Sequence, residues 1–342
     1  MSIPVLTFFN NKGGVGKTSL VYHLSWMFYD LGYRVLACDL DPQANLTSMF
    51  IHEERLEELW TEEGDRKTIY NALLPLLDGT GDIKPAHLEN IAHGQIRKKL
   101  NLIVGDLMLS TAEDELSRQW PECLDRRPRA FRVISALWRI LQDAANERDV
   151  EIILVDVGPN LGALNRAILV ATDYVIVPLG ADLFSLQGLR NLGPTLQNWR
   201  DGWKDRRNRN PDPDLPMPEG KITPIGYVVQ QYSVRLDRPV LAYDKWVNRM
   251  PAEYSRNLLM DNTEPYAKTP EEDKKNSLGT VKHYRSLVPM AQEARKPIFH
   301  LKPADGAIGA HASAASAAYH DFKILAEKVV KRIDINTTIS PE

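Results

Sequence analysis

Short apolar runs alternate with segments of helical spacing along the first fifty residues. The apolar run Pro4 to Phe9 ends at two asparagines, and apolar residues then recur at helical spacing over 18–31 until Gly32. A second apolar run follows at Arg34 to Cys38. This order of strand, glycine-rich turn, helix and strand predicts two parallel strands joined by a right-handed crossover.

The same order returns in the second half of the chain. Strands are expected at Glu151 to Val157, Tyr174 to Pro178 and Ile222 to Gln230, with helices at Leu161 to Ala171 and Leu183 to Trp199. These strand runs are apolar on both faces, which is typical of a parallel sheet covered by helices on each side. We therefore predict an α/β fold with a mostly parallel central sheet flanked by helices on both faces, plus helical insertions.

The remaining segments differ in character. They are an acidic, helix-prone stretch at Glu53 to Arg66, a strand at Leu100 to Val104 leading into a helix capped at Ser110 or Thr111, a basic loop from Arg200 to Gly220, an exposed mobile loop over 262–280, and a closely packed helix from about 310 to Val330. We expect one domain over 1–335 with insertions at 51–99 and 236–283, followed by a disordered tail at 336–342.

The composition fits a globular protein and gives no global signal for a partner. The chain has 342 residues, a formal net charge of -3 and a pI of about 6.3, so contact with nucleic acid or an anionic membrane would have to be local. Cys38 and Cys123 fit no metal or disulfide spacing. No apolar run approaches the roughly 18 residues of a membrane span, and the first residues lack the pattern of a signal peptide. A cytoplasmic location is expected.

The turn after the first strand reads "NNKGGVGKTS" and begins at Asn10. Glycines free successive backbone N–H groups to wrap phosphates, while the N-terminus of the next helix points its dipole at them. Lys17 stands where it would reach the β- and γ-phosphates, and Thr18 would offer its hydroxyl to Mg²⁺. Asn11 stands in place of the first glycine of this phosphate-binding loop (P-loop). The departure is mild, because Asn tolerates left-handed backbone conformations. The predicted phosphate-binding residues are Asn11, Lys12, Gly13, Gly14, Val15, Gly16, Lys17, Thr18 and Ser19.

Carboxylates follow two of the predicted strands. Asp39 and Asp41 come at the end of the second strand, and Asp156 ends the apolar run that begins at Glu151. Ligands bind at the carboxyl ends of the strands in open parallel sheets. Carboxylates so close to apolar strands are costly without a cation. The pattern therefore predicts a cation site beside the P-loop.

These residues also carry a family resemblance. "KGGVGKTS" followed by "DLDPQANLT" resembles the deviant Walker A proteins, the ParA/MinD group of dimerising P-loop ATPases, and most closely the ParA partition ATPases. "ILVDVGPNLGALNRAIL", "VIVPLGADLFSLQGLRNL" and "LNLIVGDLMLSTAEDELS" are similar to later blocks of that family, and the C-terminal stretch resembles it more weakly. The resemblance covers most of 1–195 and 284–332.

The resemblance implies an ATPase with ATP and Mg²⁺ at this site. Lys12 would reach across a sandwich homodimer to the nucleotide of the other subunit, acting with Lys17 and Asp41 as the catalytic set. Asp41 would orient the attacking water. The implied Mg²⁺ residues are Thr18, Asp39 and Asp156, with the two aspartates acting through water.

Two further contacts with the nucleotide are expected. Gly158 would offer its N–H to the γ-phosphate, although the usual paired prolines appear here as Gly158-Pro159. Gln230 either contacts adenine or is a plain turn residue after the strand, and the base could also be bound by backbone alone.

The resemblance also implies that the ATP-bound dimer binds DNA without sequence preference and that a ParB-like partner stimulates hydrolysis, giving a nucleoid-associated protein. The candidate DNA-binding residues are Arg206, Arg207, Lys282, Arg285, Arg295 and Lys296. Two alternatives stay open. One is a nucleotide-dependent scaffold without DNA binding. The other is a membrane-cycling ATPase of the MinD kind, which the weakly apolar stretch after Val330 disfavours, so no membrane partner is expected.

Overall fold

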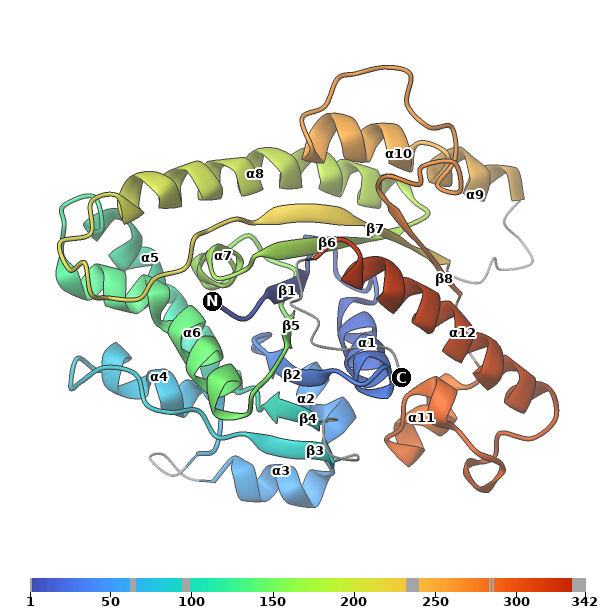
Figure 1. The fold of residues 1–342 in the computed structure, drawn as a ribbon, viewed down its shortest axis with the longest axis horizontal. Coiled ribbons are helices and arrows are strands. Elements are labelled where there is room, and N and C mark those ends of the chain that lie inside the picture. The colour runs from blue at the N-terminus through green and yellow to red at the C-terminus, as the bar shows by residue number, and fades with distance from the viewer. Residues whose placement is uncertain are drawn as a thin grey trace.

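A computed structural model describes residues 2–61, 66–93, 99–231, 240–282, 284 and 286–333. Its described strands form one sheet in the order β3-β4-β2-β5-β1-β6-β7-β8 (Figure 1). All neighbouring pairs are parallel except β3 with β4, which is antiparallel. The strands are β1 (Val5–Phe8), β2 (Arg34–Asp39), β3 (Glu89–His93), β4 (Lys99–Ile103), β5 (Ile152–Asp156), β6 (Tyr174–Gly180), β7 (Thr223–Gln231) and β8 (Ser277–Lys282).

Helices cover both faces of this sheet. On one face lie α1 (Lys17–Asp30), α2 (Asn45–Phe50), α3 (Glu53–Leu59), α11 (Val288–Ala294) and α12 (Ala310–Val330). On the other lie α4 (Ile69–Leu77), α5 (Ala112–Glu122), α6 (Pro128–Glu147), α7 (Ala163–Val170), α8 (Leu183–Arg207), α9 (Val240–Val247) and α10 (Met250–Glu253). Short helical turns are η1 (Leu107–Thr111), η2 (Tyr254–Leu258), η3 (Ile298–His300) and η4 (Pro303–Asp305).

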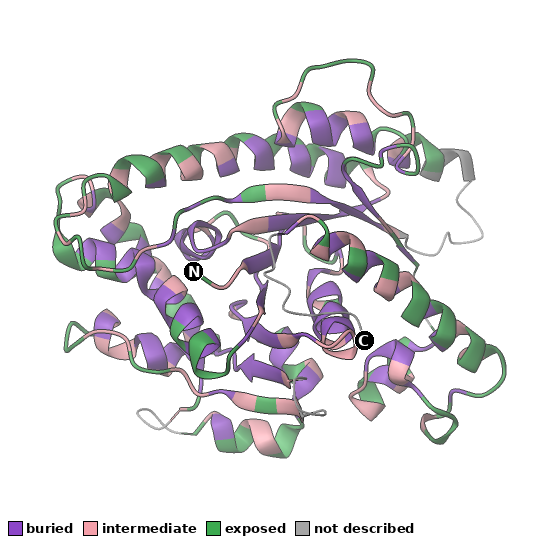
Figure 2. Cartoon of the chain, viewed as in Figure 1, coloured by how far each residue is buried: buried purple, intermediate pink, exposed green. Residues whose placement is uncertain are grey.

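The central strands are buried on both sides, as their apolar runs predict. In β1 every residue is buried, and successive side chains alternate between the two cores: Val5 packs with α6 and its neighbours, whereas Leu6 packs with α1 and α12. Figure 2 shows the same burial through the middle of the sheet. The α/β fold with a mostly parallel sheet and helices on both faces is confirmed.

The basic loop predicted over Arg200 to Gly220 is wrong at its start, because α8 continues to Arg207; the rest of that segment, from Asn208, is irregular as predicted. The apolar face of the helix explains this: Trp203 is fully buried, and its Nε1 donates to the carbonyl of Pro218 at 3.0 Å. Four of the eight residues 200–207 are basic, which favoured a loop. In an amphipathic helix such residues lie beside the apolar face and do not interrupt it.

The predicted mobile loop over 262–280 is wrong at its end. Residues from Ser277 form the edge strand β8, which pairs in parallel with β7. Thr111 stands at the predicted N-cap position of α5, but its side chain makes no capping hydrogen bond there. The cap with a side-chain hydrogen bond lies earlier: Asp106 accepts from the backbone N–H of Met108 at the start of the helical turn η1. The sequence pattern also gave no expectation for α6, the long helix on the sheet. The helix to Val330 is confirmed as α12.

Candidate nucleotide site

The P-loop joins β1 to α1 at the carboxyl edge of the sheet. Gly14 and Gly16 have φ values of 71° and 76°, which an L side chain would strain. Gly16 is the residue before the first turn of α1, so the backbone N–H groups of that turn face the loop. Val15 is buried beneath the loop, whereas Gly13, Gly14 and Ser19 are exposed. The loop thus has the backbone of a phosphate cradle.

Asn11 does not adopt the left-handed backbone that its place in the motif led us to expect, since its φ is not positive. Its side chain is directed at α8 instead: a Cβ built on Gly188 would lie 2.8 Å from Asn11 Oδ1. Asn10 is also anchored there, because its Nδ2 donates to the carbonyl of Pro178 at 2.7 Å. The two asparagines therefore fasten the P-loop to β6 and α8.

Lys17 lies inside the P-loop. Its Nζ donates to the carbonyl of Asn10 at 3.2 Å and to that of Lys12 at 3.3 Å, and the residue is 7% exposed. Burial lowers its pKa, while the nearby carboxylates of Asp156 and Asp41 act in the opposite direction. The ammonium group is thus held at the centre of the loop by weak carbonyl contacts that a phosphate could replace.

Asp156 is a buried carboxylate with no hydrogen-bond partner in the described part of the chain, on either oxygen. Burial raises its pKa well above the usual value, and the neighbouring Asp39 adds to the rise, whereas the nearby Thr18 hydroxyl lowers it. A bare buried carboxylate beside a hydroxyl and a phosphate loop is a donor set that suits Mg²⁺, which is bound by carboxylates and substrate phosphates. The residues present therefore fit the metal.

Asp39 has a different environment from the one its predicted Mg²⁺ role suggests. Its Oδ2 accepts from the backbone N–H and the hydroxyl of Thr47, at 2.7 and 2.8 Å, and its Oδ1 accepts from the N–H of Asp41 at 3.3 Å. Burial is the main reason that its pKa rises to about 7. Thr47 was not singled out from the sequence, although it stands within the motif "DLDPQANLT". Asp39 fastens the segment that follows β2, so that Asp41 is held in place.

Asp41 faces the segment that follows β5. It is 7% exposed, and its Oδ1 accepts from the N–H of Gln43 at 3.0 Å. A Cβ built on Gly158 would lie 3.3 Å from the same oxygen. The structure therefore brings Asp41, Asp156 and Gly158 together beside Lys17.

Lys12 points away from Lys17 and forms an ion pair with Asp182 of the same chain. Asp182 also accepts from the backbone N–H of Ser185 at 2.9 Å, which caps α8. Burial acts to raise the pKa of Asp182, but the hydrogen bonds from Lys12 and from the backbone of Ser185, together with the Lys12 charge, hold it below its ordinary value. Asp182 was not singled out from the sequence.

Gln230 also lies at the P-loop. A Cβ built on Gly16 would be 3.4 Å from the Gln230 side-chain carbon Cδ. β7 thus places this amide beside the start of α1, at the border of the phosphate cradle.

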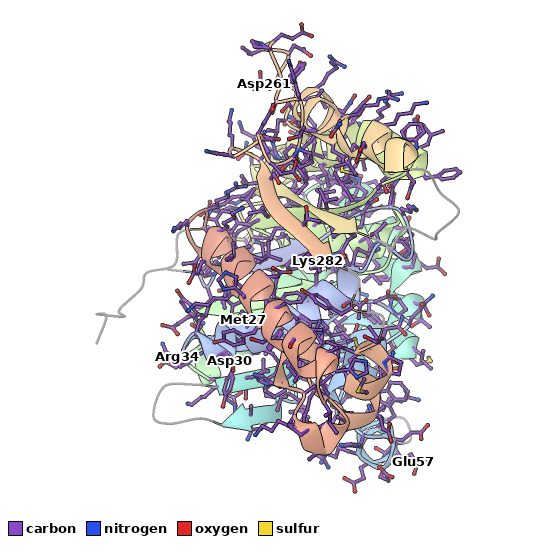
Figure 3. All side chains as sticks on the ribbon, turned by 90° about the vertical axis from the view of Figure 1, so that its right-hand side faces the viewer. Met27, Asp30, Arg34, Glu57, Asp261 and Lys282 are labelled. Carbon is purple, nitrogen blue, oxygen red and sulfur yellow. The ribbon has the colours of Figure 1, made fainter. Side chains whose placement is uncertain are left out.

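The candidate DNA-binding residues do not form one group. Arg206 packs inward on the Trp120 ring, 4.2 Å from its centroid, and its Nε donates to the Trp120 carbonyl at 2.8 Å. Arg207 is exposed. Lys282 is 64% exposed and lies 4.0 Å from Asp321 of α12 (Figure 3).

The other candidates have internal partners or are not described. Arg295 donates to His52 at 2.9 Å and to the Ser48 carbonyl. Lys296 donates to both oxygens of Asp305, at 2.7 and 3.0 Å. Arg285 lies outside the described residues.

A glycine-rich loop at a helix N-terminus, with a buried lysine and buried carboxylates at the carboxyl edge of a parallel sheet, defines a P-loop nucleotide-binding protein. A family model described as "AAA domain" matches residues 3–208, more than half of the chain. The chain belongs to this family, and its relatives place it among the ParA-family P-loop ATPases.

The chromosome partitioning protein ParA of Caulobacter vibrioides is 30% identical over 205 residues, which are 60% of this chain and 66% of that protein. A protein from Corynebacterium diphtheriae has a similar structure, with a TM-score of 0.69 at 25% identity over 98% of this chain and 100% of that chain. The ATP complex of an McdA variant from Cyanothece has a TM-score of 0.61 at 15% identity, over 99% of each chain.

The chain spans about half of the length of several curated relatives that it matches. Among the residues described, none of the helices combines the length and the apolar character needed to cross a membrane.

Proposed function

We propose that this protein is an ATP-dependent dimerising switch that binds DNA without sequence preference in its ATP state. It acts in the partition of plasmid or chromosome DNA, or in positioning a cargo on the nucleoid, in the cytoplasm, and a ParB-like partner stimulates its hydrolysis of ATP. The observation that carries the proposal is the division between two lysines of one P-loop. Lys17 is buried in the loop, whereas Lys12 is directed outward to Asp182.

Nucleotide binding uses the P-loop and Lys17. The N–H groups of Gly13 to Ser19 surround the phosphates, and the Lys17 ammonium exchanges its two carbonyl contacts for phosphate oxygens. Gln230, which lies against Gly16 of the P-loop, would contact the nucleotide from the end of β7. The ATP complex of the structurally similar McdA variant supports ATP as the ligand of this fold.

Asp156 and Thr18 would hold Mg²⁺, which supplies charge compensation on the phosphates when it is bound. Asp39 keeps its bonds to Thr47 and acts at a distance from the metal, by holding the segment that carries Asp41. Asp41 orients the attacking water, because its carboxylate lies beside Gly158, whose N–H is expected at the γ-phosphate. Positioning of this kind is most of the catalysis available to a loose phosphoryl-transfer transition state.

Dimerisation requires Lys12 to change partners. Its ion pair with Asp182 is within the chain, so Lys12 must leave that carboxylate to reach the nucleotide of a second copy. The residues next to Asp182 suit such an approach, because Leu183 and Phe184 are 50% and 73% exposed. Exposed apolar side chains next to the Lys12–Asp182 ion pair favour burial of this region against another protein surface.

The wild-type protein gives the first test. We expect a monomer with ADP and a dimer with ATP and Mg²⁺ in gel filtration, and retention on non-specific duplex DNA only with ATP at low salt. The ATP bridge between subunits is the physical reason, since the γ-phosphate is the charge that Lys12 would compensate in trans. A monomer with ATP that ignores DNA at low salt would refute the partition role and favour a nucleotide-dependent scaffold.

Arg206 and Arg207 give a matched pair for the DNA contact. Arg207→Ala should weaken DNA retention and reduce the slope of log affinity against log salt by about one per subunit, because one phosphate contact is lost. Arg206→Ala should instead lower the free energy of unfolding by about 1 kcal/mol, because it removes the stacking on Trp120 and two hydrogen bonds. Salt titrations of DNA binding and thermal melts distinguish the two. Unchanged DNA retention and salt dependence in Arg207→Ala would place the DNA face elsewhere.

A further inference from the structure

The segment 158–162, here called the switch loop, links β5 to α7 and lies against the candidate catalytic carboxylate. Its first residue is so close to Asp41 that an added Cβ on Gly158 would meet Asp41 Oδ1 at 3.3 Å. The outer part of the loop is exposed at Asn160 and at Leu161 (38% exposed), whereas Gly158 is buried. The position of Gly158 must therefore be set by contacts from the protein side.

Asn165 supplies the first of these contacts. It lies in the first turn of α7, is 1% exposed, and its Nδ2 donates to the carbonyl of Gly158 at 2.8 Å and to that of Asn160 at 2.7 Å. Both amide protons are therefore used on the switch loop, one at its start and one at its middle. A single buried amide holds the two carbonyls in a fixed relation to α7.

Glu113 of α5 supplies the second contact. Its two carboxylate oxygens accept from the backbone N–H groups of Ala163 and Leu164, the latter at 2.8 Å. No side chain of α7 caps the helix, since the residue before it is Gly162. Glu113 thus caps α7 from another helix, with its charge at the favourable end of the helix dipole.

Gly162 leaves room for the Glu113 carboxylate in this arrangement. A Cβ at this position would lie 2.3 Å from Glu113 Oε1, which is less than any real contact. The close fit shows that α5 and the end of the switch loop are built against each other. Glu113 is separated from Ala163 by 50 residues of sequence, so the contact depends on the packing of α5 on α7.

We propose that Asn165 and Glu113 are positioning residues that hold the switch loop in register with Asp41 and with the γ-phosphate of ATP. Asn165 fixes the loop carbonyls, and so the direction of the Gly158 and Asn160 peptide groups, while Glu113 fixes the helix to which the loop is tied. Neither side chain touches the reacting atoms. This proposal rests on the proposed ATPase function. The two residues would govern how the site distinguishes ATP from ADP, which lacks the γ-phosphate.

The test compares nucleotide binding with hydrolysis in Asn165→Ala. We expect the affinity for ADP to stay within about twofold, because the P-loop and Lys17 hold the β-phosphate without the switch loop. The preference for AMPPNP over ADP should fall by about tenfold, and the hydrolysis rate at saturating ATP should fall by about tenfold or more, since a misplacement of about 1 Å can cost 10²-fold. Fluorescent-nucleotide displacement and single-turnover phosphate release measure the three quantities.

Variants of α5 keep the test open if Asn165→Ala does not fold. Glu113→Ala should reproduce its pattern, and Glu113→Gln, which keeps an acceptor oxygen, should recover part of the rate. Asp114→Ala removes an exposed carboxylate from the same turn of α5 and should behave as wild type.

The possible outcomes separate this inference from the proposed function. If ADP and AMPPNP affinities fall together in the Asn165 and Glu113 variants, or if preference and rate both stay at wild-type values, the positioning role is overturned. If the wild type itself neither prefers AMPPNP nor hydrolyses ATP, the proposed ATPase function fails instead.

Discussion

Asp41→Ala is expected to lock the protein in an ATP-bound dimer on DNA. Removing the carboxylate that orients the attacking water should lower the hydrolysis rate by about 10²-fold or more. ATP binding should be kept or improved, because the substitution removes a negative charge next to the phosphates; that charge, after burial, also acts to raise the pKa of Asp39 and Asp156. Phosphate release and the half-life of the complex on immobilised DNA measure the two effects.

Asp41→Asn provides the matched control for this prediction. The amide oxygen can still accept from the N–H of Gln43, so the segment after β2 keeps its hydrogen bond while the carboxylate charge is lost. Both variants should form the persistent complex if the charge orients water. If the asparagine variant hydrolyses ATP at the wild-type rate, the role of Asp41 is structural, and rapid turnover in Asp41→Ala would contradict any role in the reaction.

The sequence predicted the parts of the site that lie in contiguous motifs. The P-loop and the acids after β2 and β5 were predicted because strand, turn and helix signals are local and each motif carries its own geometry. The parallel sheet then brings Asp39 beside Asp156, which are paired in the register of β2 and β5. Proximity of these two carboxylates follows from the fold class alone.

The contacts across the fold could not be predicted in the same way. Lys12 meets Asp182 only because β1 lies next to β6 in the sheet, and 170 residues separate the two in sequence. Glu113 also acts on a distant position, Leu164, through a hydrogen bond that leaves no periodic pattern. The basic end of α8 was predicted as a loop because charge was given more weight than the burial of Trp203.

Lys12→Ala is expected to leave a protein that binds ATP but stays monomeric. Lys17 and the backbone of the P-loop remain, so the affinity for ATP should change by only a few-fold, whereas the charge that would cross to the second subunit is gone. Retention on DNA should be lost with the dimer. Nucleotide titration, analytical ultracentrifugation with ATP and Mg²⁺, and DNA retention test the three parts.

Asp182→Asn tests the exchange of partners from the other side. Asparagine is as good a helix cap as aspartate, so α8 keeps its first hydrogen bond while the ion pair with Lys12 is weakened. A partly exposed ion pair is worth about 0.2–1 kcal/mol, and two are broken per dimer, so dimerisation with ATP should occur at an about 2- to 30-fold lower protein concentration. Weaker dimerisation of Asp182→Asn would contradict the exchange of partners, and normal dimerisation of Lys12→Ala would show that Lys12 serves its own chain.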